Sequence, residues 1–308
     1  MQDDFSKQVA GLPLPGSGQT AERWWRLASL GRDDLVLARL AEGHADATAI
    51  RAELKDEPSA DPDSERWGVW AAVPSSLEAR RTEDGAWSVS GDRPWCSGAG
   101  SCTHALVTAV AEDGVRLFAV EVREPAATPL DDTWPAVGMA GSDSRTVRFA
   151  DCPARPVGGP GDYVGRPGFW HGGVGVAACW YGGATGVADT LLAAARTRDL
   201  NPHALAHLGA VDGLLHTARL ALRDAAERID AEPSADAQQL AVRVRTVVDS
   251  VATQVLDHVG RALGAGPLCQ DAAHARRVAD LTVYLRQSHA EADLAQLGTL
   301  LKENPPAW

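Results

Sequence analysis

Residues 66–158 constrain the fold more than any other part of the sequence, because they contain a run of short strand-like segments between two helical regions. In the clearest of these, Trp87 and Val89 fall on one side while Ser88 and Ser90 fall on the other, which is the alternation of a half-buried strand. Short strands at close spacing predict an antiparallel barrel or sandwich. The predicted strands are Trp67–Ala72, Leu77–Thr82, Trp87–Ser90, His104–Val110, Arg116–Glu121 and Ser144–Phe149.

Helical periodicity dominates both flanks of this segment. Residues 20–55 place apolar side chains at helical spacing, beginning with Trp24, Leu27 and Ala28. Beyond residue 168 the sequence predicts long apolar-faced helices with short connections, which is the pattern of a bundle. These helices are expected over Gly172–Val187, Val211–Ile229, Leu240–Val259 and roughly Ala272–Leu297.

The order of helices, strands and helices predicts an α+β multi-domain chain with three parts. A short N-terminal helical segment is expected over residues 1–65, of which 1–18 form a flexible lead. A middle β-domain is expected over residues 66–158, and a C-terminal four-helix bundle over residues 159–308.

The charge balance and the cysteines exclude several classes of protein. The 308 residues carry 41 acidic and 29 basic side chains, a formal net charge of −12. Nucleic-acid binding is not expected, because it needs clustered lysine and arginine. Five cysteines without a Cys-x-x-Cys pair fit a reducing cytosol, so a cytoplasmic location is expected. No apolar run has the length of a membrane span, and the N-terminus lacks the features of a signal peptide.

Two histidines one helical turn apart raise the question of a metal site. His203 and His207 have the i, i+4 spacing that zinc sites use. No glutamate stands between them and no third ligand is evident, so no metal is predicted. The glycine patterns of a hydrolase nucleophile elbow and of a dinucleotide-binding fold are also absent from the sequence.

The segment after the strand at Trp87 carries the strongest functional signal. Gly91-Asp92 predicts a turn, and an aromatic ring, a small residue and a hydroxyl follow at Trp95-Cys96-Ser97. A flat ring beside a hydrogen-bonding hydroxyl is suited to support a flat ligand with polar edges, such as a flavin.

Two sequence blocks and the order of the parts resemble the acyl-CoA dehydrogenase family. In that family a strand ending in Gly-x-Lys leads to Trp-Ile-Thr, and here Gly91-Asp92-Arg93 leads to Trp95-Cys96-Ser97. The family's next block, G-M-R-G-(T/S)-D-(S/T), is similar to Gly138-Met139-Ala140-Gly141-Ser142-Asp143-Ser144. The resemblance covers about residues 20–298 and implies the family's fold, with a shortened N-terminal domain.

The resemblance implies FAD as the cofactor. The Trp95-Cys96-Ser97 turn would line the flavin, with the indole packed on the isoalloxazine ring and the serine hydroxyl near N5. Ser75 weakly echoes a further family block that contacts the flavin. Arg196 or Arg198, together with the glycine segment around Gly264, would approach the phosphates.

The resemblance also implies a reaction, the α,β-dehydrogenation of an acyl thioester carried by CoA or by a carrier protein. That reaction needs a base against the α-carbon and the flavin against the β-carbon. The family's glutamate is absent both from its loop position and from Val176–Trp180. His289 and Glu291 are the nearest acid–base groups to the loop position and are the candidate catalytic residues. The alternative is that both belong to the solvent-exposed face of the last helix.

Two other functions are compatible with these residues. Flavin monooxygenases are built on the same fold, and a C-terminal histidine assists their oxygen chemistry, a role open to His289. A catalytically degenerate homologue acting as a structural or partner subunit would account for the missing base and the shortened N-terminal region. The family resemblance further implies a homodimer or homotetramer assembled through the C-terminal bundle, and the apolar helices permit such contacts.

Overall fold

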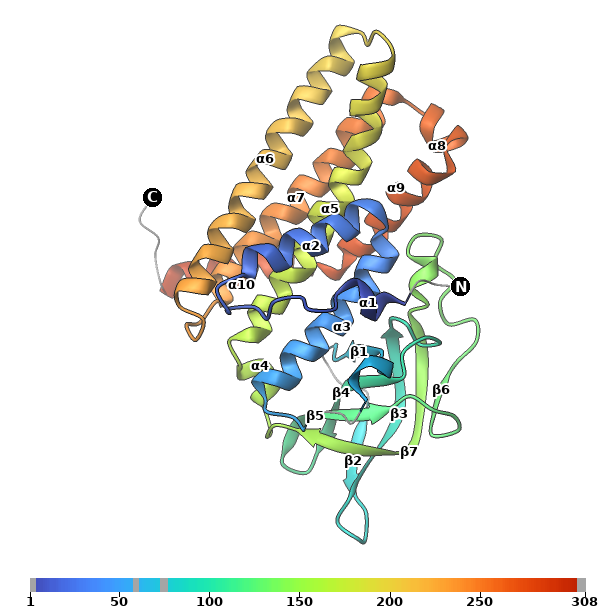
Figure 1. Ribbon diagram of the computed structural model, residues 1–308, viewed down its shortest axis with the longest axis vertical. Helices are drawn as coiled ribbons and strands as arrows, with labels where there is room; N and C mark the ends of the chain where they lie inside the picture. The colour runs from blue at the N-terminus through green and yellow to red at the C-terminus, as the bar shows by residue number, and fades with distance from the viewer. Residues whose placement is uncertain (1–3, 58–60, 73–76, 304–308) are drawn as a thin grey trace. The chain divides into compact units, whose positions relative to one another are not determined.

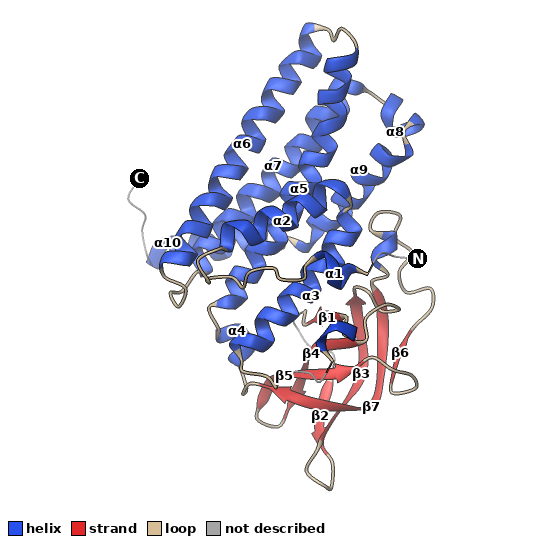
Figure 2. Ribbon diagram, viewed as in Figure 1, coloured by secondary structure: helices blue, strands red, loops and turns tan. Residues whose placement is uncertain are grey.

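The structure, a computed structural model, describes residues 4–57, 61–72 and 77–303 (Figure 1). Helices and strands are both abundant, which confirms the predicted α+β class (Figure 2). The described chain divides into two compact units. The sheet unit comprises the residues up to 12, 39–136 and 140–169, and the helical unit comprises 13–38, 137–139 and the residues from 170 onward. The boundaries of the three predicted domains stay a prediction.

The strands of the sheet unit pair into a closed ring. Neighbouring strands follow the order β4, β2, β3, β7, β5 and back to β4, while β1 pairs with the first half of β4 and β6 pairs with β7. The closure is narrow at one point, because β2 and β4 share the single pair Glu78 and Val110. The strands are β1 (Trp67–Trp70), β2 (Glu78–Arg81), β3 (Trp87–Cys96), β4 (His104–Ala111), β5 (Gly114–Glu121), β6 (Ala127–Pro129) and β7 (Arg145–Val157).

The sheet is mixed, so the prediction of a purely antiparallel barrel or sandwich is wrong in this respect. Both β1 and β2 run parallel to β4, whereas the other pairings are antiparallel. The reason lies in the connections. Because β3 is antiparallel to β2 and the loop at residues 97–103 reverses the chain again, β4 returns in the direction of β2.

The predicted turn at Gly91-Asp92 is also wrong, because β3 continues through it. Gly91 pairs with Phe149 of β7, and the Asp92 carboxylate accepts two hydrogen bonds from the Arg148 guanidinium, each 2.8 Å long. The register of the two strands shifts between Val89 and Gly91. The glycine therefore accommodates a β-bulge in a long strand instead of ending a short one.

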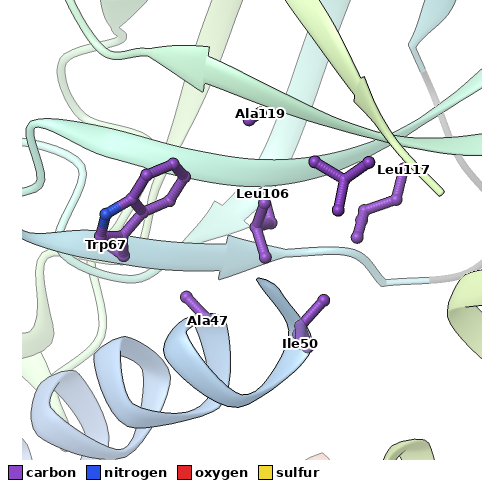
Figure 3. Packing of buried hydrophobic residues seen from close by; sticks show 7 residues of the cluster. Ala47, Ile50, Trp67, Leu106, Leu117 and Ala119 are labelled. Carbon is purple, nitrogen blue, oxygen red and sulfur yellow. The ribbon is translucent and has the colours of Figure 1, made fainter. Parts of the chain in front are cut away.

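The C-terminal half of α3 (Leu35–Glu53) supplies the core of the sheet unit (Figure 3). Ala47 and Ile50 of this helix are fully buried in one cluster with Trp67 and Leu106. Alanine at one of these helical positions allows a close approach to the strands, and the larger side chains fill the remaining space. The complete cluster is Ala47, Ile50, Trp67, Leu106, Leu117, Ala119 and Val157.

The N-terminal segment is ordered where it is described, which corrects the expectation of a flexible lead over residues 1–18. Helix α1 (Phe5–Gln8) is capped by Asp4, whose carboxylate accepts from the backbone N–H of Ser6. Phe5 is 2% exposed and packs edge-on against the ring of His44, with 6.2 Å between ring centroids. Burial of this phenylalanine offsets the entropy of ordering the short segment.

The helical unit is built from long helices that carry the predicted apolar faces. Val211, Ala218, Leu222 and Ile229 line the buried side of α6, as the spacing predicts. The long helix α7 packs against α6 and ends at Gly264. The helices are α2 (Thr20–Asp33), α5 (Gly168–Thr197), α6 (Pro202–Ala231), α7 (Gln238–Leu263), α8 (Gly266–Gln270), α9 (Ala272–Tyr284) and α10 (Glu291–Glu303), and the short α4 (Asp162–Gly165) precedes α5 in the sheet unit.

Glycines let α2 and α5 approach each other at backbone distance. A Cβ atom on Gly182 would lie 2.1 Å from the carbonyl oxygen of Ala28, and one on Gly31 would lie 2.7 Å from that of Cys179. These distances are far shorter than a carbon–oxygen contact, so only glycine fits. The helix predicted over Gly172–Val187 is thus part of α5, and its glycines allow the close packing on α2.

The last predicted helix is interrupted, which corrects the expectation of one helix over about Ala272–Leu297. Helix α9 ends at Tyr284, the 3₁₀ turn Leu285–Gln287 follows, and α10 begins at Glu291. Ala290 adopts a left-handed φ of 48°, which an α-helix cannot accommodate. Leu285 and Tyr284 are buried, so the packing of the turn fixes the break.

Two further features concern the whole described chain. Among the described residues, no helix combines the length and the apolar character that a membrane span requires. All five cysteines lie in the described part of the chain, where none of them forms a disulfide, and four are buried.

Replacing Gly182 by alanine tests the contact between α2 and α5. We expect Gly182→Ala to lower the free energy of unfolding by about 1–3 kcal/mol, because the methyl group must displace the Ala28 carbonyl. The matched control is Gly213→Ala on α6, where an added Cβ meets nothing within 4 Å. The control should gain about 0.5–1 kcal/mol from helix propensity. Equal effects of the two substitutions in urea titrations would contradict the packing described here.

Candidate functional site

Trp95 lies at a β-bulge near the end of β3. The register against β7 shifts between Arg93 and Cys96, so that Pro94 and Trp95 together oppose one residue of β7. Trp95 consequently adopts a left-handed φ of 60° and is 67% exposed. For a bulky residue this backbone conformation costs about 1–2 kcal/mol. A strained backbone that presents a large aromatic ring to the surface marks a candidate site, because packing does not explain it.

A chain of three hydroxyls begins beside Trp95. The Oγ atoms of Ser97 and Ser144 are 2.9 Å apart, and those of Ser144 and Ser142 are 2.8 Å apart. Ser142 and Ser144 are buried, with 1% and 6% exposure, whereas Ser97 is partly exposed. The strand register explains why Ser97 and Ser144 are close. Cys96 pairs with Arg145, so in the antiparallel register the following Ser97 lies opposite the preceding Ser144.

Backbone hydrogen bonds hold the loop after Ser97 in one position. The N–H of Gly98 donates to the carbonyl of Ser142 over 2.7 Å, and the N–H of Gly100 donates to the Asp143 carboxylate over 2.8 Å. Arg145 donates to the same carboxylate over 2.7 Å and neutralises it. The Trp70 indole N–H completes the frame by donating to the carbonyl of Ser97 over 2.9 Å. The turn is thus a rigid platform, as binding sites require.

Cys96, although it lies in the predicted turn, turns its side chain into the sheet unit. It is fully buried, and its thiol contacts the carbonyl of Arg93 over 3.2 Å. Burial raises the pKa of the Cys96 thiol, which keeps it protonated and unreactive. At the surface this residue can therefore offer a ligand only its backbone.

Arg93 places a positive charge inside the sheet unit. The residue is 2% exposed, and its guanidinium donates to the carbonyl of Ala72 over 2.5 Å and lies 3.4 Å from the hydroxyl of Thr108. These acceptors are neutral, and burial lowers the pKa of the Arg93 guanidinium. Its Nε has no hydrogen-bond partner among the described residues. This buried charge sits two residues before Trp95, on the same strand.

The other predicted cofactor residues lie elsewhere. Ser75 falls outside the described residues. Arg196 occupies the last turn of α5 and Arg198 follows it, both exposed. Gly264 ends α7 with a φ of 67°. These two arginines and this glycine belong to the helical unit, whereas the Trp95-Cys96-Ser97 turn belongs to the sheet unit.

The candidate catalytic residues lie at the break between α9 and α10. The side chain of His289 is 77% exposed, and its Nδ1 is 3.2 Å from the Asp293 carboxylate, which also accepts from the His289 backbone N–H. Glu291 is exposed in the first turn of α10. Both side chains reach solvent, and the carboxylate of Asp293 orients the imidazole.

Two side chains of α7 brace this break. Arg245 donates to the carbonyl of Gly173 over 2.7 Å and to that of Gln287 over 3.4 Å. Asp249, one helical turn further along, lies 3.9 Å from the Arg286 guanidinium. Burial raises the pKa of the Asp249 carboxyl, and Arg286 opposes the effect. The bracing fixes the turn that carries His289, and sequence spacing alone did not identify it.

Sequence analysis also missed the role of Asp280. Its carboxylate accepts from the backbone N–H of Met139, which has a left-handed φ of 56°. A Cβ on the neighbouring Gly138 would lie 2.1 Å from the carbonyl oxygen of Ala279, so residues 137–139 lie directly on α9. Part of the signal was present in the sequence, because Gly138-Met139 belongs to a segment that resembles a family block.

A charged cavity in the sheet unit has a structural explanation. Its volume is about 270 Å³, and Arg51, Glu65, Trp67 and His104 line it. Glu65 accepts from the Trp67 indole over 2.8 Å and from Arg51 over 3.4 Å, while Arg51 stacks 4.2 Å from the Trp67 ring. The charged side chains that line the cavity thus pair with one another. Within the described ranges, no three histidine, cysteine, aspartate or glutamate side chains are grouped so that they could hold a metal ion.

Comparison with known proteins finds similarity at the level of the fold. No family model and no curated protein matches the sequence. Among solved structures, the dibenzothiophene monooxygenase TdsC from Paenibacillus sp. A11-2, in complex with FMN and indole, has a TM-score of 0.80 at 19% identity over 98% of this chain and 87% of that chain. Methanesulfinate monooxygenase MsuC from Pseudomonas fluorescens gives 0.80 at 17% identity over 98% and 89%.

The 3-HSA hydroxylase from Rhodococcus sp. RHA1 is similar to the same extent, with a TM-score of 0.79 at 17% identity over 100% of this chain and 92% of that chain. Identities this low establish the fold and leave activity to be argued from the residues. The acyl-CoA dehydrogenase-like fold expected from the two sequence blocks is confirmed at this level.

Glycine at position 95 tests the backbone strain. Glycine adopts a positive φ without the Cβ penalty, so we expect Trp95→Gly to be about 1 kcal/mol more stable than Trp95→Ala. Because Trp95 is mostly exposed, neither variant should lose much packing energy. Chemical denaturation of the two variants measures the difference. A more stable alanine variant would show that the backbone at this position is unstrained.

The pH dependence of stability tests the buried carboxyl of Asp280. Burial raises its pKa in the folded chain, so the folded state binds this proton more tightly than the unfolded state. Stability from this group is therefore complete below about pH 4 and is lost as the pH rises through the folded pKa. Asp280→Asn keeps an acceptor for Met139 without the charge. Its melting temperature should match the wild type near pH 4 and exceed it at pH 8, and a constant difference would contradict the assignment.

Proposed function

We propose that this chain is a flavin-dependent monooxygenase that acts on a small molecule. The observation that carries the proposal is the strained, exposed indole of Trp95 on a rigid turn, two residues before the hydroxyl of Ser97. An exposed indole lowers its free energy by stacking on another flat ring. In this proposal, reduced flavin supplies the electrons that activate O₂.

The residues of the turn fit a flavin. The Trp95 ring would cover one part of the isoalloxazine, and the Ser97 hydroxyl would hydrogen-bond to its N5 edge. The hydrogen bonds of Gly98 and Gly100 to the segment at Ser142 and Asp143 keep both groups in place before any ligand arrives. Such preorganisation reduces the entropy lost on binding. Arg196, Arg198 and Gly264, which belong to the helical unit, stay predictions for the phosphate end.

Oxygenation is favoured over dehydrogenation for two reasons. A dehydrogenase needs a carboxylate held against the substrate, but Glu291 is exposed and Val176–Trp180 is an apolar, buried segment. The similar structures reported above include two monooxygenases and a hydroxylase, which supports the same choice. Dehydrogenation of an acyl thioester, implied by the family resemblance, is the second candidate.

His289 is the proposed acid–base residue. Its imidazole is accessible, and the Asp293 carboxylate at 3.2 Å favours one ring orientation. The brace from Arg245 and Asp249 holds the turn that presents it. Glu291, two residues further, is the alternative group. An imidazole can take a proton from a substrate or return one to it near neutral pH, which suits the insertion of an oxygen atom.

We propose FMN as the flavin, because TdsC was crystallised with FMN. FAD, which the family resemblance implies, differs by an adenosine monophosphate group. The two are distinguished by titrating the purified chain with each and following the quenching of flavin fluorescence. Tighter binding of FAD would reverse this assignment without altering the rest of the proposal.

The experiment that tests the function uses the full chain with bound flavin. The flavin is reduced without oxygen and then mixed with aerated buffer, and oxygen consumption is recorded. We expect rapid oxidation by O₂ and no bleaching of oxidised flavin by a series of acyl-CoA thioesters under anaerobic conditions. Bleaching by an acyl-CoA would instead establish a dehydrogenase. A chain that binds no flavin would overturn the enzymatic proposal and favour a structural or partner subunit.

Removal of the indole should weaken flavin binding. We expect Trp95→Ala to raise the Kd for flavin about tenfold, because a stacking contact of about 1–1.5 kcal/mol is lost. Trp95→Phe should recover part of the affinity. The matched control is Val115→Ala, which also removes an exposed apolar side chain from the sheet unit. Unchanged affinity in Trp95→Ala would place the flavin elsewhere.

A further inference from the structure

The hydroxyl chain behind Ser97 does more than position one side chain. Among the described residues, the hydroxyl of Ser144 contacts two groups, the hydroxyls of Ser97 and Ser142, at 2.9 Å and 2.8 Å. A serine hydroxyl has one proton to donate and lone pairs that accept. The hydroxyl of Ser144 therefore donates a hydrogen bond to one of these neighbours and accepts one from the other.

The direction of that one proton decides what Ser97 can offer to a ligand. When Ser144 donates to Ser97, the O–H of Ser97 is free to donate outward. When Ser144 donates to Ser142, Ser97 donates inward to Ser144 and presents a lone pair outward. Both arrangements are uncharged, so the three serine hydroxyls can change from one to the other by rotation.

We propose that Ser144 is a positioning residue that lets Ser97 act as a donor to oxidised flavin and as an acceptor from reduced flavin. The inference rests on the proposed function. N5 of an oxidised flavin carries a lone pair, whereas N5 of a reduced flavin carries a proton. A backbone N–H at this place could serve the oxidised form alone. A hydroxyl backed by a second hydroxyl serves both, because Ser144 accepts the hydrogen bond of the Ser97 O–H when the flavin is reduced, and no proton is transferred.

The two inner hydroxyls are buried, so the reversal of the hydrogen bonds depends on these serines and not on water. Ser142 and Ser144 are 1% and 6% exposed, so bulk water does not replace their hydrogen bonds. A buried donor without an acceptor is rarer than an oxygen with one unused lone pair, because the oxygen has a second lone pair that can still accept. Loss of Ser144 therefore affects the reduced complex more, because Ser97 then accepts from N5 while its own proton has no partner.

The test compares the affinity of the full chain for oxidised and for reduced FMN, the reduced form under anaerobic conditions. We expect Ser144→Ala to raise the Kd for reduced FMN about tenfold and the Kd for oxidised FMN about threefold or less. The midpoint potential of the bound flavin should become more negative accordingly. Ser144→Thr keeps the hydroxyl and should restore both affinities.

A second variant removes the innermost of the three hydroxyls, that of Ser142. Ser142→Ala removes the inner acceptor, so the proton of Ser144 can go only to Ser97, which is then fixed as a donor. This variant should also weaken the binding of reduced FMN more than the binding of oxidised FMN. The matched control is Ser101→Ala, which removes a hydroxyl of the same loop that bonds to the Gly98 carbonyl and not to the chain. Thermal melting without flavin shows whether each variant is folded.

The outcomes separate this inference from the proposed function. A wild-type chain that binds neither form of FMN overturns both. A wild-type chain that binds both forms, with Ser144→Ala weakening the two equally and Ser144→Thr failing to restore them, overturns the inference and leaves the function standing. Unequal weakening in both alanine variants, with recovery in the threonine variant, establishes the role of Ser144.

Discussion

The antiparallel pairing of β3 with β7 is the constraint on which the candidate site depends. Its register shift at Pro94 and Trp95 forces the indole outward into a strained backbone conformation. The same register, continued past the strand ends, brings Ser97 to Ser144. One ladder of backbone hydrogen bonds therefore fixes the two chemically distinct parts of the site. The strain is tolerated because β3 pairs with β7 both before the bulge, at Arg93, and after it, at Cys96.

The helical unit depends on a different feature, which is the close approach of backbones at glycine residues. Gly182 and Gly31 remove the side chains that would keep α2 and α5 apart, and Gly138 does the same where residues 137–139 lie against Ala279 of α9. The interruption before α10 is fixed separately, by the burial of Tyr284 and Leu285. Arg245 and Asp249 add polar contacts to the turn there. The exposed His289 is thus carried by a fixed element.

Much of the fold was predictable, for reasons that particular elements show. The strand at Trp87 and the helix faces at Val211 and Val248 follow from local periodicity, because burial on one side imposes a fixed spacing. The continuation of β3 through Gly91 was not predictable, because a glycine signals a turn and a bulge equally well. The parallel pairing of β1 and β2 with β4 also escaped prediction, since it depends on where distant loops reverse the chain.

By itself, the sequence determined most of the segments that become strands and helices, and it identified Trp95 and Ser97 as a flat ring followed by a hydroxyl. Both follow from properties of neighbouring residues, namely spacing and side-chain chemistry. The tertiary structure alone decided that Trp95 is exposed, that Cys96 is buried, and that Ser142 and Ser144 stand behind Ser97. These facts depend on the register between strands almost fifty residues apart, and a shift of one residue would turn every side chain to the opposite face.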